Sequence, residues 1–555
     1  MFIATIDRRA FLSGAVAAAV LPLSGQDRLP SLEPLGSPRA FPSADQLAWQ
    51  DLEIGMFVHF APNTWQDKEG DDLSTPLSAI DPDIDTDNWA ECAVNLGARY
   101  IVFVAKHQGG FCMWQTQTTK YGIANTPWKQ GRGDVLSDLS ASCRKRSLRL
   151  GVYLSPRDDY FGAGIGGVCN DPTRQAAYNA MYREQLTEVL TRYGAMVEVW
   201  FDGSSVVPTS DLVRKYAAHA AIFQGPDATI RWVGNENGFA PYPLWDAESK
   251  PDARSGVSTS MHGDPNGDAW IPVECDVSIR RPNWFWSTAN QRNLMTLDDL
   301  IEVYYRSVGR GAQLLLNIPA DRRGHMPDAD FARAREFGAE IRRRFATSLA
   351  ETHGRGAHLE IPLAALTRVD HVILEEDCRF GQRVRAFRVE GLAANEWISL
   401  NDGTSIGHKR IVPVAPREFS ALRLKVTESE GEPRIRQFAA FNTGVAPPRS
   451  WNAAAEIWAA DSVGEWKDSK FAVDLTAQIK DATQYRLRFV PESGRLRLIE
   501  GVELLLDGAR APQLVRADSS APDVLILTMT AIGQKVLLRG RVAGAERGTI
   551  LMQKL

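Results

Sequence analysis

Short, almost continuously apolar runs alternate with amphipathic stretches between about residues 50 and 345. Apolar runs without polar alternation are typical of strands that are buried on both faces, as in parallel sheets. We predict seven such strands: Ile54–Phe60, Tyr100–Lys106, Leu148–Ser155, Met196–Gly203, Thr229–Glu236, Trp270–Asp276 and Gln313–Pro319. Strands that alternate with helices over about 300 residues favour a (β/α)8-type barrel, with an open doubly wound sheet as the alternative.

Three of the intervening helices are indicated by apolar residues that recur every three or four positions. The first runs from Asp85 to Gly97, where an aspartate can cap the start and a glycine can end the helix. The other two end before Gly194 and before Gly309. These helices are expected to cover the outside of the predicted barrel.

The pattern changes after Arg344, where period-two stretches are separated by Gly, Asn and Pro turns. Such a pattern predicts antiparallel β-sandwich structure on the C-terminal side of the barrel. The expected organisation is a targeting segment over 1–26, the barrel over 45–346, an accessory β-sandwich over 357–446 and a second β-sandwich over 451–555.

The first residues read as an export signal of the twin-arginine type. The pair Arg8-Arg9 precedes Ala10-Phe11-Leu12, an apolar run from Ala15 to Leu23 and a short polar stretch. The apolar run is too short for a permanent transmembrane helix, so we expect no membrane anchor. A periplasmic or secreted location is therefore predicted.

Composition and motifs exclude several classes of function. The 555 residues carry a net charge of −5 with acidic and basic side chains interspersed, which argues against nucleic acid as a partner. Six cysteines without CxxC spacing, and the absence of HExxH, suggest no metal site. No GxGxxG turn follows the first strand, so no cofactor is expected, and none of the predicted barrel strands ends in a GxSxG elbow.

Polar side chains recur where the predicted strands end, which is where parallel barrels carry their active sites. In chain order these are His59, Lys106-His107, Tyr153, Asp202, Glu236, and Glu274 with Asp276. Paired carboxylates beside aromatic rings are typical of the active sites of glycoside hydrolases. One carboxylate attacks or stabilises the anomeric carbon, and the other protonates the leaving oxygen.

The motifs at these positions resemble glycoside hydrolase family 29, the α-L-fucosidases, in its more linkage-selective branch. The segments that carry the resemblance are Gly55–Phe60, Ala105–His107, Gly110–Trp114, Gly151–Pro156, Val199–Gly203, Trp270–Glu274 and Leu315–Pro319. The resemblance implies a retaining exo-α-L-glycosidase that acts on an oligosaccharide or glycan, with Asp202 as its nucleophile. For the acid/base it leaves Glu236 and, as the runner-up, Glu274. The resemblance and the strand-end pattern together suggest these residues for substrate binding: His59, Glu69, His107, Gln108, Trp114, Tyr153, Trp200 and Trp286.

Two departures from the family pattern put the sugar in question. Gln108 stands where the family commonly has the second histidine of Lys-His-His-Asp-Gly-Phe, and Gly70 follows Glu69 where a tryptophan is common. The alternatives to fucose release are therefore the same mechanism on another α-L-sugar such as L-galactose, or a secreted glycan-binding protein without activity.

Overall fold

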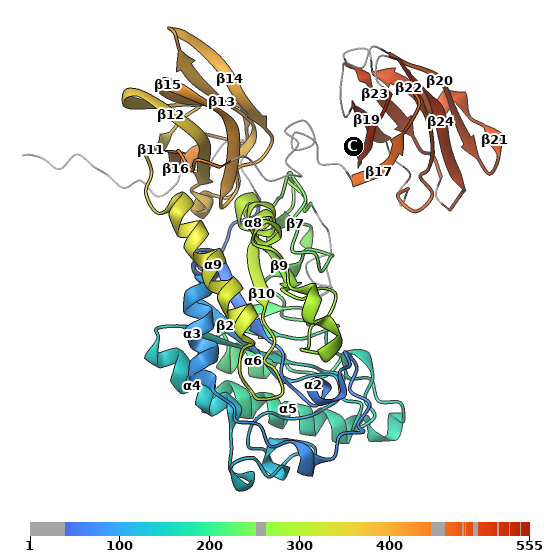
Figure 1. The fold of residues 1–555 in the computed structure, drawn as a ribbon. Coiled ribbons are helices and arrows are strands. Elements are labelled where there is room, and N and C mark those ends of the chain that lie inside the picture. The colour runs from blue at the N-terminus through green and yellow to red at the C-terminus, as the bar shows by residue number, and fades with distance from the viewer. Residues whose placement is uncertain are drawn as a thin grey trace, which may run out of the picture.

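The computed structural model describes residues 39–250, 262–445 and 461–554, with short gaps inside the last range. The predicted targeting segment 1–26 lies outside the described residues, so its assignment stays a prediction. The described residues form a parallel barrel and two antiparallel β units (Figure 1).

Eight parallel strands form the barrel. They pair in the order β5-β4-β3-β2-β1-β10-β9-β6, and a parallel bridge between Phe223 and Ile230 joins the two ends of this sheet. The strands are β1 (Ile54–Val58), β2 (Tyr100–Lys106), β3 (Arg149–Leu154), β4 (Met196–Trp200), β5 (Ala221–Phe223), β6 (Arg231–Trp232), β9 (Val273–Ser278) and β10 (Gln313–Asn317). This confirms the predicted fold class.

One barrel strand, β5, was not predicted from the sequence. β5 has only three residues, and a single turn rather than a helix leads from it to β6. Such a short run carries too little periodic signal to be recognised. As a consequence, Glu236 follows the sixth barrel strand and not the fifth, and Glu274 lies on the seventh.

Helices flank the barrel, and the first of them places Trp49 among the inward-facing side chains. They are α1 (Ala44–Gln50), α2 (Asn63–Gln66), α3 (Thr86–Leu96), α4 (Val135–Lys145), α5 (Gln175–Arg192), α6 (Ser210–Tyr216), α8 (Leu297–Arg306) and α9 (Asp328–Phe345). The predicted caps of α3 are confirmed, because the Asp85 side chain accepts from Asn88 N and Gly97 ends the helix in the left-handed conformation. A small antiparallel pair, β7 (Ala247–Glu248) with β8 (Ala269–Trp270), lies beside the barrel sheet.

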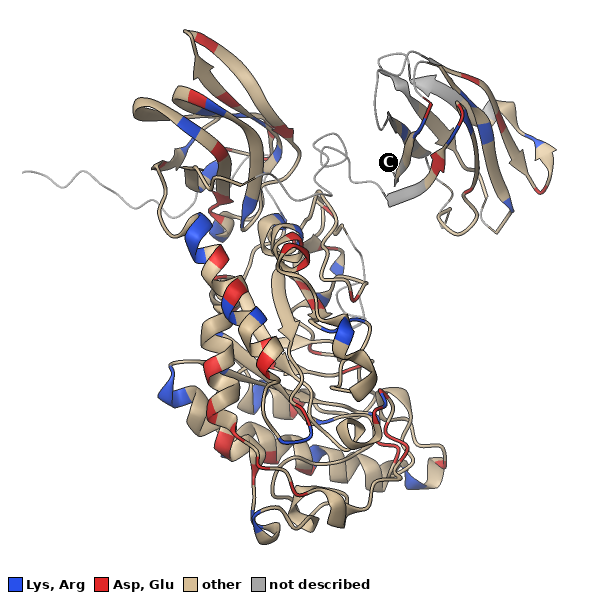
Figure 2. Ribbon diagram, in the orientation of Figure 1, with Lys and Arg blue, Asp and Glu red and all other residues tan. Residues whose placement is uncertain are grey.

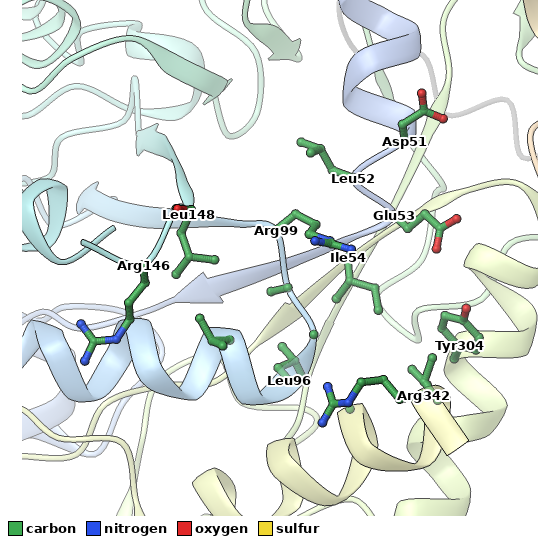
Figure 3. Close-up of a pocket in the computed structure, with 16 residues that line it drawn as sticks. Asp51, Leu52, Glu53, Ile54, Leu96, Arg99, Arg146, Leu148, Tyr304 and Arg342 are labelled. Atoms are coloured by element: carbon green, nitrogen blue, oxygen red, sulfur yellow. The ribbon is translucent and has the colours of Figure 1, made fainter. Parts of the chain in front are cut away.

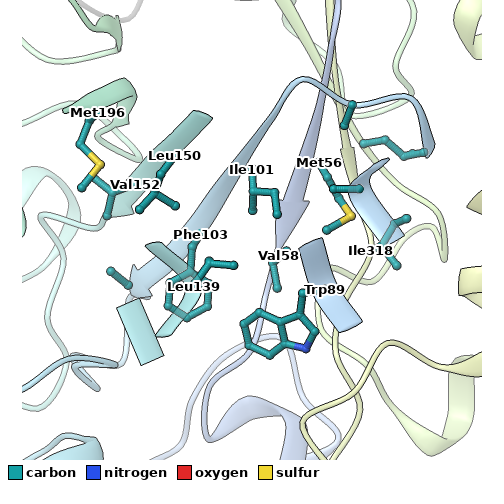
Figure 4. Packing of buried hydrophobic residues seen from close by; sticks show 14 of the residues in the cluster. Met56, Val58, Trp89, Ile101, Phe103, Leu139, Leu150, Val152, Met196 and Ile318 are labelled. Atoms are coloured by element: carbon teal, nitrogen blue, oxygen red, sulfur yellow. The ribbon is translucent and has the colours of Figure 1, made fainter. Parts of the chain in front are cut away.

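Alternate side chains of each strand point outward to the helices and inward to the barrel axis. The outward set packs with helical residues such as Trp89 and Leu139 into the main core, where Ile101 and Phe103 are fully buried (Figure 4). The inward set is more aromatic and more polar, and its members at the carboxyl ends of the strands form the floor of the cavity described below.

The first C-terminal unit is a six-stranded antiparallel sheet in the order β11-β16-β12-β15-β13-β14. Its strands are β11 (Ala350–Arg355), β12 (His358–Glu376), β13 (Val384–Ala393), β14 (Glu396–Gly403), β15 (Arg410–Ser429) and β16 (Arg434–Phe441). The long strands β12 and β15 pair with a register break between Pro362 and Thr367, and the sheet encloses its own apolar core.

The second unit packs a five-stranded sheet and a four-stranded sheet around one apolar cluster, which is the arrangement of a β-sandwich. Its strands are β17 (Asp461–Trp466), β18 (Lys470–Asp474), β19 (Gln484–Pro491), β20 (Leu498–Leu506), β21 (Ala509–Arg510), β22 (Val515–Asp518), β23 (Ala521–Thr528), β24 (Val536–Ala543) and β25 (Gly548–Lys554). Residues 446–460, where the predicted boundary falls, lie outside the described residues.

The six-stranded unit holds the segment that follows β6. Tyr242 donates its hydroxyl to Ser405 O at 2.8 Å and accepts from Thr404 N at 3.0 Å. Gln382 accepts from Asp246 N at 2.6 Å and donates to Leu244 O at 3.2 Å. These contacts fix the chain a few residues beyond Glu236.

Acidic and basic residues are interspersed along the described ribbon, with no long run of one sign (Figure 2). Within the described residues, none of the helices is long and apolar enough to cross a membrane.

Candidate active site

A cavity of about 340 Å³ opens at the carboxyl ends of the barrel strands. Seven of the eight strands, or the loops that follow them, contribute to its wall. The lining residues are Phe57, His59, Glu69, Gly70, His107, Gln108, Tyr153, Trp200, Asp202, Phe223, Gln224, Trp232, Glu236, Asp276 and Trp284. The cavity therefore brings together eight of the eleven residues that the sequence suggested.

A larger cavity, of about 550 Å³, lies at the opposite end of the strands (Figure 3). It is lined where β1, β2 and β3 begin, by residues such as Ile54, Arg99 and Leu148. Its two carboxyls are already paired, Asp51 with His408 and Glu53 with Lys409, and in parallel barrels this end serves stability rather than catalysis. The smaller cavity is therefore the candidate active site.

Asp202 is placed by the end of β4 and by the turn that follows it. Phe201 N donates to Phe223 O, which continues the pairing with β5 for one residue beyond β4. The chain then turns through Gly203 and Ser204, both with positive φ, and the Gln224 side chain accepts from both of their N–H groups. This turn directs the Asp202 carboxylate into the cavity.

Two donors converge on one oxygen of Asp202. The Tyr153 hydroxyl donates to Oδ2 at 2.8 Å, and Gln108 Nε2 donates to the same atom at 2.9 Å. Arg157 in turn donates to Gln108 Oε1 at 3.1 Å, which fixes the amide orientation. The carboxylate is thus held in one position by its Oδ2. Neither Tyr153 nor Gln108 donates a hydrogen bond to Oδ1.

Gln108→Ala is expected to lower kcat/KM by about 10- to 100-fold, because it removes one of the two hydrogen bonds to a charged carboxylate. The effect should appear mainly in kcat, and steady-state kinetics on an aryl glycoside will measure it. Tyr153→Phe removes the other bond and serves as the matched comparison. Unchanged kinetics for Gln108→Ala would show that this amide does not support Asp202.

Two neutral histidines face the sugar space. Burial lowers the pKa of His59 well below its usual value and that of His107 to about 4. Nδ1 of His59 contacts Asn317 Oδ1 at 2.8 Å, and that oxygen only accepts, so Nε2 of His59 is left as an acceptor. Nδ1 of His107 is buried without a partner in the described part of the chain. Both rings can therefore exchange hydrogen bonds with sugar hydroxyls.

Glu69 joins two loops at the cavity rim. Its carboxylate accepts from the Asn283 side chain and from Trp284 N, both at 2.9 Å. The Trp284 ring lines the cavity and lies 5.3 Å from the His59 ring between centroids. Trp284 therefore lines the cavity in place of Trp286, which the sequence had suggested for substrate binding.

Glu236 lies in the loop after β6, at the mouth of the cavity. Arg281 Nη1 donates to its Oε2 at 2.7 Å, and the Glu236 side chain is 44% exposed. A carboxyl in this position can reach both a bound sugar and the solvent, which is what an acid/base needs to protonate a leaving group and later to activate water.

Asp276 is a third carboxyl in the cavity, which the sequence analysis noted at a strand end without assigning it a role. The Trp232 indole donates to its Oδ1 at 2.6 Å. Burial raises the pKa of Asp276 to about 7, and the nearby Glu236 and Asp202 carboxylates act in the same direction. A carboxyl that is protonated over part of the neutral range can donate a hydrogen bond to a substrate hydroxyl.

Asp276→Asn is expected to flatten the pH dependence of stability. The folded pKa lies above the ordinary Asp value, so the stability contributed by Asp276 is fully present below about pH 4 and is lost as the pH rises through about 7. Relative to wild type, the asparagine variant should gain about 1–3 kcal/mol between about pH 5 and pH 8. Urea unfolding of both proteins at the two pH values measures this, and parallel pH dependences would contradict the burial argument.

Three suggested residues lie outside the cavity wall, and this corrects their expected roles. Glu274 is fully buried inside the barrel below the cavity, where it accepts from Trp200 Nε1 at 2.8 Å. Trp114 is fully buried between β2 and the helices and donates to Glu188 at 2.7 Å. Trp286 packs against Arg322, with 5.5 Å between the guanidinium carbon and the ring centroid.

The arrangement of the cavity fits acid/base chemistry with a carboxylate nucleophile on a small polar ligand. The aromatic rings of Phe57, Trp200 and Trp284 provide apolar walls, and the carboxyls and histidines provide hydrogen-bonding groups. No group of three His, Cys, Asp or Glu side chains that could hold a metal ion occurs within the described ranges.

Comparisons with known proteins give a consistent result. The α-L-fucosidase family model matches residues 71–343. A protein of Oryza sativa subsp. japonica that is named as an α-L-fucosidase 1 is 34% identical over 450 residues, which cover 72% of this chain and 84% of the relative. A crystal structure of a protein named as an α-L-fucosidase from Bacteroides thetaiotaomicron shares 30% identity with a TM-score of 0.69, over 73% of this chain and 99% of that one. A Ruminococcus gnavus fucosidase in complex with fucose shares 25% identity with a TM-score of 0.65, over 74% and 97% of the two chains.

Proposed function

Since this chain belongs to the α-L-fucosidases, glycoside hydrolase family 29, we propose that it is a retaining exo-α-L-fucosidase that releases terminal L-fucose from glycans. The observation that carries the proposal is that Asp202 and Glu236 line one cavity with aromatic walls at the carboxyl ends of the barrel strands. A cavity with a floor admits the end of a glycan, which favours removal of a terminal sugar.

In this mechanism Asp202 attacks the anomeric carbon and forms a glycosyl-enzyme, while Glu236 protonates the departing oxygen. Water then enters from the cavity mouth, and Glu236 takes its proton as the water attacks the same carbon from the other side. Two displacements restore the original anomeric configuration. Tyr153 and Gln108 keep Asp202 in the attacking position.

The test is release of sugar from a panel of aryl glycosides: α-L-fucoside, α-L-galactoside, β-D-galactoside and α-L-rhamnoside. Fucose release supports the proposal and shows that Gln108 is tolerated. No hydrolysis of any aryl substrate or of natural fucosylated glycans would contradict the proposal and would favour a glycan-binding protein without activity.

Another α-L-sugar is the second candidate, because the sugar-facing surface differs from the common family pattern. Gln108 is engaged by Asp202 and Arg157, and Gly70 leaves the cavity wall without a side chain where an aromatic ring is common. This space can admit a hydroxyl at C6, which L-galactose has and fucose lacks. Activity on the α-L-galactoside above that on the fucoside would establish this alternative.

Export through the twin-arginine route remains a proposal that rests on Arg8-Arg9 and the apolar run that follows. The six cysteines are all free and buried, so the described fold needs no oxidative step outside the cytoplasm. Replacing both arginines by lysine is expected to retain the protein in the cytoplasm of a bacterial host, as measured by cell fractionation. Unchanged export of the Lys-Lys variant would contradict this route.

A further inference from the structure

Two buried glutamates below the cavity have no part in the proposed reaction. Glu198 on β4 and Glu274 on β9 are both fully buried inside the barrel, and neither lines the cavity. Burial of two carboxyls so close together is unfavourable unless hydrogen bonds compensate for the lost hydration. Their contacts therefore indicate what they stabilise.

Each glutamate accepts a hydrogen bond from a tryptophan. Trp49 Nε1 donates to Glu198 Oε2, and Trp200 Nε1 donates to Glu274 Oε1, both at 2.8 Å. The other oxygen of each carboxyl, Oε1 of Glu198 and Oε2 of Glu274, is buried without a partner among the described residues. The charge of Glu198 helps to raise the pKa of Glu274, and a proton shared between the two carboxyls would satisfy both. Two carboxyl oxygens can pair in this way only when one of them carries a proton. Burial raises the pKa of both groups, which keeps that proton in place.

The pair reaches the active site through Trp200. This ring lines the cavity and stacks on Phe223, with 3.6 Å between centroids and an interplanar angle of 3°. On its other side lies Tyr153, at 5.6 Å and 24°. Tyr153 is one of the two residues that donate to Asp202. A change in the orientation of the indole would therefore move both the cavity wall and one of the supports of the nucleophile.

We propose that Glu274 is a positioning residue, which accepts the Trp200 N–H while paired with Glu198 and so fixes the indole that forms the cavity wall and supports Tyr153. The effect of Glu274 on hydrolysis rests on the proposed function. The hydrogen bond from Trp200 to Glu274 does not depend on that function. Glu274 acts through Trp200 and does not exchange a proton with the substrate.

Two substitutions separate positioning from acid/base chemistry. Glu274→Gln keeps an acceptor for Trp200 and a donor for Glu198, so kcat/KM should stay within about threefold of wild type. Glu274→Leu leaves the indole N–H without an acceptor and should lower kcat/KM by roughly 10- to 100-fold, as expected for a displaced catalytic group. Azide should rescue neither variant. Wild-type kinetics for a folded Glu274→Leu protein, or azide rescue of Glu274→Gln, would overturn the proposal.

The chain offers a matched control for general destabilisation. Glu188 accepts from the buried Trp114 indole at 2.7 Å, but neither residue lines the cavity. Glu188→Leu should lower thermal stability and leave kcat and KM of the folded protein unchanged. In a Trp200→Phe background, Glu274→Leu should add no further kinetic effect, because the indole N–H that donates to Glu274 is already absent. Equal kinetic losses in Glu188→Leu and Glu274→Leu, or additive losses in the double variant, would count against positioning.

A second measurement is independent of activity. In protein labelled with ¹⁵N-tryptophan, the indole N–H signal that disappears in Trp200→Phe is assigned to Trp200. Its hydrogen exchange should be slow in wild type and in Glu274→Gln, and at least about tenfold faster in Glu274→Leu. Equal exchange rates in all three would overturn the proposal, even where the wild-type protein hydrolyses fucosides. Inactivity of the wild type on every glycoside, with these exchange rates as expected, would instead contradict the proposed function alone.

Discussion

Asp202→Ala is expected to lower turnover of an aryl α-L-fucoside by more than about 10³-fold while the protein remains folded, because the variant has no group to form the glycosyl-enzyme. Asp202 lies two residues beyond β4 and receives hydrogen bonds from Tyr153 and Gln108, so it is held for attack rather than for a structural contact. Steady-state kinetics and thermal unfolding of the same preparation measure the two effects.

Asp202→Asn is the control of matched shape, and it should be almost as inactive as the alanine variant. In the alanine variant, added azide can occupy the vacated space and attack the sugar directly, which gives a glycosyl azide of inverted configuration. Near-wild-type turnover in either variant, or an azide product of retained configuration, would contradict the nucleophile assignment.

Glu236→Ala is expected to lower hydrolysis of a fucosylated disaccharide by about 10²–10⁴-fold, because the leaving sugar must then depart without a proton. An aryl fucoside with a very acidic phenol needs little protonation, so its first step should be affected much less. Pre-steady-state kinetics should show a fast release of the phenol followed by slow turnover. Azide should restore turnover and give a glycosyl azide of retained configuration.

Glu274→Ala is the comparison that decides between the two candidates from the sequence. It should show neither the dependence on leaving group nor the azide rescue, because Glu274 lies inside the barrel below the cavity. If Glu274→Ala showed both signatures and Glu236→Ala showed neither, the assignment of the acid/base would be wrong.

The barrel and the position of Asp202 in the cavity could be predicted because the local signals are strong. Apolar runs mark the strands, and a carboxylate that directly follows such a run must lie at the carboxyl end of the barrel, as Asp202 does. The choice between Glu236 and Glu274 depended on where a strand ends. β6 ends at Trp232 and leaves Glu236 in a loop, whereas β9 continues to Ser278 and keeps Glu274 inside.

The remaining differences between the predicted site and the structure come from side-chain direction and from loop conformation. Asp276 follows Glu274 by two residues and so shares its inward face, and this period-two relation in the sequence could have identified it. The choice between Trp284 and Trp286 depends on the course of an irregular loop, which hydrophobic periodicity does not report. Trp114 follows β2 within a family motif, but its side chain turns toward the helices and Glu188.

The configuration of the first product tests the central claim most directly. Hydrolysis of an aryl α-L-fucoside at high enzyme concentration should be followed by ¹H NMR from the first minutes, before the released sugar mutarotates. The account predicts that α-L-fucose appears first and that the β anomer grows only later. Initial release of β-L-fucose would contradict a covalent intermediate on Asp202 and, with it, the proposed roles of both carboxylates.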